Sequence, residues 1–147
     1  MTVAVGLIGI IVPVAQRREA GAAIPGASVN SWWIALLLGL AAVVTVARLP
    51  EAFPVPAGQS PVLPGVVAAV AEEAFFRKLT YGWLARWGDA LAASVTAVAF
   101  ALVHVPAYGP QVLPIDFAAG LVFGWQRWMT GGWSVPALTH LTANLLA

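Results

Sequence analysis

Residues with chemically useful side chains stand in three short patches of an otherwise apolar sequence. The patches are Glu72 and Glu73 with Arg77, Phe100 with His104, and His140 with Asn144. A carboxylate and an imidazole placed together can hold a water molecule and take a proton from it. An imidazole and a carboxamide can donate hydrogen bonds to the oxyanion that forms when this water attacks a carbonyl group. The residue types therefore favour hydrolysis by an activated water molecule.

Helical spacing distinguishes the two adjacent glutamates. Glu73 and Arg77 are four residues apart, so in a helix they share a face and can form an ion pair. Glu72 points about 100° away around the helix and is the freer carboxylate. His140 and Asn144 are also four residues apart, which in a helix places an imidazole and an amide side by side.

Composition indicates that these patches lie in a membrane. Of the 147 residues, 61% are hydrophobic and 9% are charged, whereas a soluble domain has roughly 25% charged residues. The net charge of +1 gives no sign of nucleic-acid binding, and the lack of cysteine excludes a disulfide framework, a thiolate metal site and a cysteine nucleophile. An ionisable side chain near the centre of a bilayer is costly unless it is paired or hydrated, so each one is a functional candidate.

Apolar segments follow one another along the chain at residues 2–15, 32–47, 62–84, 91–105, 113–129 and 133–147. Each is near or somewhat below the ~20 residues that cross a hydrocarbon core, and backbone polar groups in lipid must be paired within their own segment. We therefore expect an all-α, polytopic transmembrane helical bundle of about six spans. It forms a single domain over residues 1–147, with the motif-bearing core at residues 62–147. Gly120 and Gly124 predict a close contact between helices, and Asp116 is expected at the membrane interface.

The polar patches are expected at similar depths in the membrane. With a rise of ~1.5 Å per residue, Glu72 lies ~15 Å inside a helix that begins near residue 62. On the same rise, His140 and Asn144 lie ~10 Å and ~16 Å from the start of the last helix, and His104 lies ~20 Å from the start of its own. All four side chains then fall within one or two helical turns of the midplane, where they can form one site.

Lysine and arginine positions predict the orientation. With six spans, the odd-numbered loops and the adjoining helix ends hold Arg17, Arg18, Lys78, Arg86 and Arg127, whereas the even-numbered loops hold Arg48. The positive-inside rule then places the odd-numbered loops in the cytoplasm. All seven tryptophans fall near the same face, as interfacial anchors do. We expect an integral protein of a bacterial or archaeal plasma membrane.

The three patches, in this order and on separate apolar segments, resemble the motifs of the CPBP family of CAAX proteases and bacteriocin-processing enzymes. The resemblance covers residues 62–147 and implies a glutamate-dependent intramembrane endopeptidase of all-helical fold. It implies that Glu72 and His104 activate water and that His140 and Asn144 stabilise the oxyanion. The residues that it implies as supports of the site are Glu73, Arg77 and Phe100.

The residues alone are compatible with a site with or without a metal ion, and with more than one class of function. Glu72, His104 and His140 could also form a three-ligand zinc site with one open position, although we expect that no cofactor is required. The expected partners are a peptide or membrane-protein substrate and the lipid bilayer, with no nucleic acid, and the oligomeric state is open. A proton-coupled transporter and a non-catalytic membrane immunity or scaffold protein remain as alternatives, because both can use polar residues within spans.

Overall fold

The computed structural model describes residues 28–48 and 62–146, and all regular elements in these two ranges are helical. The elements are α2 (Val29–Ala47), α3 (Val62–Glu73), the π-helix η1 (Ala74–Thr80), α4 (Tyr81–Leu84), the 3-10 helix η2 (Ala85–Trp87), α5 (Asp89–Tyr108), the 3-10 helix η3 (Pro110–Val112), α6 (Leu113–Thr130) and α7 (Ser134–Leu146). The all-α prediction is thus confirmed for this part of the chain. The expected first span at 2–15 and the loop with Arg17 and Arg18 lie outside the described residues.

Five of the expected spans correspond to helical runs. The third expected span is one continuous run at residues 62–87 that changes pitch three times: from α to π at Ala74, back to α at Tyr81, and to 3-10 at Ala85. Two of the described helices, α2 with 19 residues and α5 with 20, are long and apolar enough to cross a membrane. The count of six spans stays a prediction.

Glycines in the left-handed region of φ mark the turns around α5. Gly88 (φ 118°) separates η2 from α5, and Gly109 (φ 84°) ends α5 before η3. A side chain is disfavoured at such angles, which explains why the chain turns at these two points. α5 runs beyond its expected end at residue 105 and includes Pro106 in its last turn.

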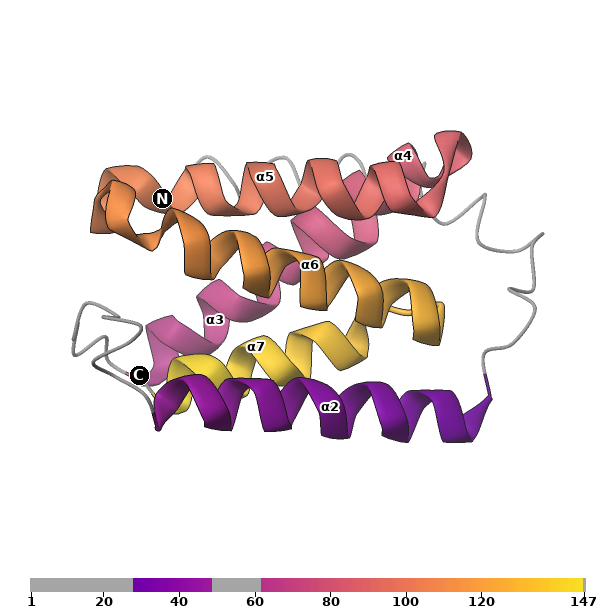
Figure 1. Cartoon of the computed structure of the whole chain (residues 1–147), viewed down its shortest axis with the longest axis horizontal. Coiled ribbons are helices and arrows are strands. Elements are labelled where there is room, and N and C mark those ends of the chain that lie inside the picture. The colour runs from indigo at the N-terminus through magenta and orange to yellow at the C-terminus, as the bar shows by residue number, and fades with distance from the viewer. Residues whose placement is uncertain (1–27, 49–61, 147) are drawn as a thin grey trace.

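The long helices pack roughly side by side, with α3 crossing them obliquely (Figure 1). α6 contacts α5 on one side and α7 and α2 on the other, and α7 also packs against α3. A Cβ atom at Gly120 would lie 2.7 Å from Ala97 Cα, and one at Gly124 would lie 3.0 Å from Ala93 Cβ. The close helix contact expected at Gly120 and Gly124 is confirmed, and it holds α6 directly against α5.

Short connections give the bundle two distinct ends. At the first, which we call the tryptophan end, α2 and α7 begin, α6 ends and η2 lies (Figure 1). The tryptophans at or near this end are Trp32, Trp33, Trp83, Trp87, Trp125, Trp128 and Trp133. At the other, which we call the distal end, α3 and α6 begin and α5 and α7 end. The expected gathering of all tryptophans at one face agrees with this arrangement.

A buried polar contact fastens α2 to the rest of the bundle. Gln126 Nε2 donates to Ala35 O at 2.9 Å and to Thr139 Oγ1 at 2.8 Å, and all three residues are buried. Gly39 leaves room for this amide, since a Cβ atom there would collide with it. Hydrogen bonds between helices of this kind typically contribute about 0.6–2 kcal/mol in a membrane.

Candidate active site

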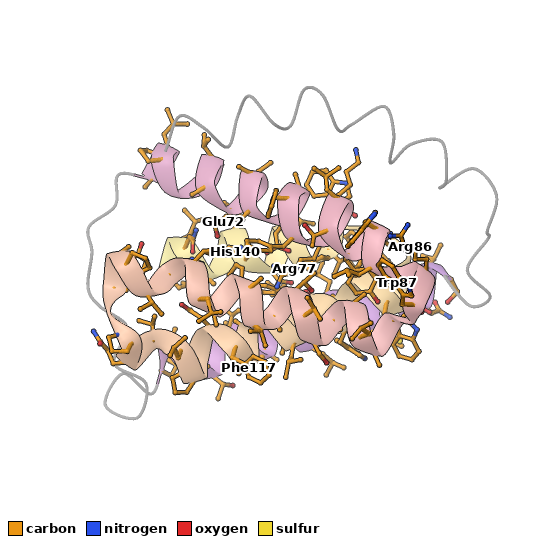
Figure 2. The ribbon with its side chains drawn as sticks, turned by 90° about the horizontal axis from the view of Figure 1, so that it is seen from above. Glu72, Arg77, Arg86, Trp87, Phe117 and His140 are labelled. Atoms are coloured by element: carbon orange, nitrogen blue, oxygen red, sulfur yellow. The ribbon has the colours of Figure 1, made fainter. Side chains whose placement is uncertain are left out.

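One carboxylate oxygen faces both histidines. Glu72 Oε2 of α3 lies 3.6 Å from His104 Nε2 of α5 and 3.8 Å from His140 Nε2 of α7. Figure 2 shows Glu72 and His140 next to each other between these helices. The distances exceed those of direct hydrogen bonds, and a water molecule commonly joins polar groups at such separations. Three of the four residues expected to form the site are therefore brought together.

The Nδ1 atom of each histidine, which does not face Glu72, has a hydrogen-bond partner of its own. His104 Nδ1 donates to Phe100 O at 2.7 Å, since a carbonyl oxygen can only accept. His140 Nδ1 lies 3.0 Å from Glu73 Oε1 and can donate to that carboxylate. A partner on Nδ1 fixes both the tautomer and the orientation of an imidazole. Each Nε2 is therefore directed at Glu72.

Glu73 and Arg77 form the ion pair that their spacing predicts. Arg77 Nε lies 3.3 Å from Glu73 Oε2, and both side chains are completely buried. Arg77 Nη2 also donates to Gly120 O of α6 at 3.1 Å. Glu73 therefore contacts Arg77 with one carboxylate oxygen and His140 with the other.

Aromatic rings surround the buried arginine and both imidazoles. The Arg77 guanidinium carbon lies 4.7 Å from the ring centre of Phe100, 5.2 Å from that of Phe123 and 5.6 Å from that of Phe76. Such cation–π contacts partly replace the hydration of a buried charge. Phe100, an expected support, also contacts His104 and His140, and Phe123 stacks on His140 at 5.1 Å. Phe123 was not expected, because in the sequence it is one apolar residue among many.

Asn144 lies apart from this group. Its Nδ2 donates to Gly65 O of α3 at 3.1 Å, and the residue is exposed. A Cβ atom at Gly65 would make an ordinary van der Waals contact with Asn144 Cβ at 3.9 Å, so the absence of a side chain there is not what permits the hydrogen bond. The structure thus differs from the expected juxtaposition with His140: Asn144 is one turn further along α7 and its amide is turned toward α3.

Asp116 is a neighbour of the site that the sequence did not reveal. Its Oδ2 lies 3.8 Å from His104 Nδ1, although the residue was expected only as an interfacial one. The signal was its position in the first turn of α6, which the short connection at residues 109–112 places beside the last turn of α5. Tyr108 stacks on His104, with 5.9 Å between ring centres.

A metal ion would need at least three protein donor atoms around one point. Within residues 28–48 and 62–146, no three His, Asp or Glu side chains are arranged to hold one.

Comparison with known proteins identifies one family. The model of the family described as "Type II CAAX prenyl endopeptidase Rce1-like" matches residues 59–146. This range is more than half of the chain and includes all three patches, so the resemblance to CAAX proteases is confirmed. No curated protein and no solved structure matches the chain.

Proposed function

Because the chain belongs to the Rce1-like CAAX endopeptidase family and is an integral membrane protein, we propose that it cleaves peptide bonds with a water molecule activated by Glu72 and His104. The observation that carries this proposal is the approach of Glu72 Oε2 to two imidazole Nε2 atoms, at 3.6 and 3.8 Å. A carboxylate and an imidazole within reach of the same water can share its proton in the transition state.

The proposed reaction assigns one role to each group. The water oxygen attacks the peptide carbonyl carbon while its proton passes to Glu72 or His104. His140, when protonated, donates from Nε2 to the resulting oxyanion, and Glu73 behind it balances the positive charge. The proton held by Glu72 or His104 is then delivered to the leaving nitrogen as the C–N bond breaks.

Of the remaining polar residues, Arg77 and Asp116 act through these groups, and Asn144 acts on the substrate directly. Arg77 holds Glu73 in place from the buried side. Asp116 stabilises the positive charge on His104, because opposite charges attract more strongly in a partly buried site than in bulk water. Asn144 is proposed as a second oxyanion donor, which requires its amide to leave Gly65 when substrate binds.

The proposed mechanism uses carboxylate, imidazole and amide groups and assigns no role to a metal ion. The substrate is a peptide or a membrane protein in contact with the bilayer. We further propose a single domain of about six spans over residues 1–147, in a bacterial or archaeal plasma membrane. Its odd-numbered loops, with Arg17 and Arg18 in the first, are cytoplasmic.

The test uses the purified full chain in detergent with a library of internally quenched peptides. Wild type should cleave members of the library, and Glu72→Gln should not, because the substitution preserves shape but removes the base. Asp89→Asn is the matched control, since Asp89 is a carboxylate at the tryptophan end whose partner is Tyr81. Activity should survive treatment with a zinc chelator. Full activity of Glu72→Gln would refute the proposal, and inhibition by the chelator would refute its metal-free form.

A further inference from the structure

The tryptophan end carries basic and aromatic side chains that the proposed reaction does not use. We infer that this end binds the phosphate group of an anionic phospholipid, chiefly through Arg86 and with Lys78 as a second contact. Such a lipid site is independent of the proposed function and of the side of the membrane that this end faces.

Arg86 lies over two neighbouring indole rings. Its guanidinium carbon is 3.8 Å from the ring centre of Trp87 and 4.5 Å from that of Trp83. The two rings meet edge to face, with 4.8 Å between their centres, and both residues are more than half exposed. Arg86 is exposed as well, and Figure 2 shows it beside Trp87 at one end of the bundle. Because cation–π contacts restrict the guanidinium to this place, less side-chain freedom is lost when it binds a ligand.

Lys78 brings a second positive charge to the same end. It belongs to the same helical run as Arg86 and lies about two turns before it. Its Nζ atom is 5.8 Å from the ring centre of Trp133, which directly precedes α7. Since α7 begins at the tryptophan end, the apolar stem of Lys78 carries the ammonium group toward this end, as lysine stems do at membrane interfaces.

No carboxylate of the described ranges neutralises these two charges. Of the four carboxylates there, three belong to the candidate active site. The fourth, Asp89, accepts a hydrogen bond from the Tyr81 hydroxyl at 2.9 Å. Within residues 28–48 and 62–146, neither Lys78 nor Arg86 forms an ion pair. Their counterion therefore has to come from outside this part of the chain.

The phosphate of a lipid meets the needs of this surface. A guanidinium binds phosphate through two parallel N–H···O bonds, and an ammonium binds it as a point charge. Exposed tryptophans lie at the level of lipid headgroups, so the rings around Arg86 favour a lipid over free phosphate. The cation of a zwitterionic headgroup would find only Asp89, which Tyr81 already engages, and a headgroup of net negative charge is therefore preferred. Each basic side chain near an anionic membrane surface raises affinity about fivefold.

Native mass spectrometry of the purified full chain tests the preference for an anionic lipid. With equal amounts of phosphatidylglycerol and phosphatidylcholine that carry the same acyl chains, wild type should retain more of the former. Arg86→Gln and Lys78→Gln should each reduce the retained phosphatidylglycerol about fivefold. Arg48→Gln is the matched control, since Arg48 is an exposed arginine that follows α2 at the distal end, and it should bind like wild type. Equal retention of the two lipids by wild type, or equal losses in all three variants, would overturn the inference.

Tryptophan quenching tests the place of the lipid. Phosphatidylglycerol with brominated acyl chains should quench wild-type fluorescence more than brominated phosphatidylcholine, because all seven tryptophans lie at or near this end. Arg86→Gln should lose this difference while its circular dichroism stays that of wild type, since a substitution at an exposed position changes stability little. Equal quenching of wild type by the two lipids would overturn the inference.

Competition separates the lipid from free phosphate. An excess of inorganic phosphate should displace no more phosphatidylglycerol than chloride does at the same ionic strength, because both salts then screen the basic side chains equally. A markedly greater displacement by phosphate would assign the site to a free anion and overturn the lipid assignment.

Discussion

The two adjacent glutamates should fail in different ways when each is replaced by glutamine. Glu73 is completely buried and contacts Arg77 at 3.3 Å and His140 at 3.0 Å. Glu73→Gln leaves the buried Arg77 without its counterion, a change that typically costs about 3–5 kcal/mol. Glu72 is partly exposed and has no arginine partner, so Glu72→Gln should change stability by less than about 0.5 kcal/mol.

These energies translate into a measurable difference in melting temperature. For a chain of this size, 1 kcal/mol corresponds to roughly 2–4 °C, so Glu73→Gln should melt about 6–20 °C below wild type. Glu72→Gln should melt close to wild type and show no cleavage. The intrinsic fluorescence of seven tryptophans gives the unfolding signal in detergent, and the quenched peptide library gives the activity.

A double variant tests whether the unpaired charge of Arg77 causes the loss of stability in Glu73→Gln. Glu73→Gln combined with Arg77→Met removes both charges and keeps a side chain of similar length among the three phenylalanines. Replacing a whole buried pair is far less damaging than removing one member, so the double variant should recover part of the stability without activity. If Glu73→Gln melts like wild type yet is inactive, while Glu72→Gln retains activity, the roles assigned to the two carboxylates are wrong.

Variants at three further residues test the roles of His104, Asp116 and Asn144. His104→Gln should leave weak activity with an altered pH profile, because a titrating group is removed; an unchanged profile would contradict the base assignment. Asp116→Asn should lower kcat severalfold with KM retained, and Asp116→Glu should restore it; equal losses in kcat for both variants would contradict a role through charge. Asn144→Ala should lower kcat about 100- to 1000-fold if its amide reaches the oxyanion. A loss of stability alone would limit Asn144 to its contact with Gly65.

Contacts along one helix, and the meeting of three helices at one depth, were predictable from the sequence. The Glu73–Arg77 pair needs only a separation of about one helical turn, and it forms although Arg77 lies in the π-helix η1. Glu72, His104 and His140 were expected together because each lies at a similar depth in the membrane, judged from its distance to the start of its own helix. The structure agrees, since all three side chains meet at one carboxylate oxygen.

Rotation of each helix about its own axis was not predictable in the same way. It is set by packing, as where Gly120 and Gly124 bring α6 against α5 and thereby place Asp116 beside His104. The same kind of packing turns Asn144 toward Gly65 instead of toward the site. Residue spacing within a single segment contains no information about which neighbour a side chain will face.

The π-helix η1 sets the phase between the two ends of the helical run at residues 62–87. Its wide turns, with Tyr81 N–H bonded to Phe76 O, release the carbonyl of Arg77, which accepts a hydrogen bond from Arg127 Nε at 3.1 Å. Because the wide turns of a π-helix hold more residues than α-helical turns do, restoring α-helical pitch over the same seven residues would rotate everything after η1 relative to α3. The π-helix therefore sets the orientation of Trp83 and Trp87, which follow it, relative to Glu72, which precedes it. A change of pitch in η1 would alter this orientation without replacing any catalytic side chain.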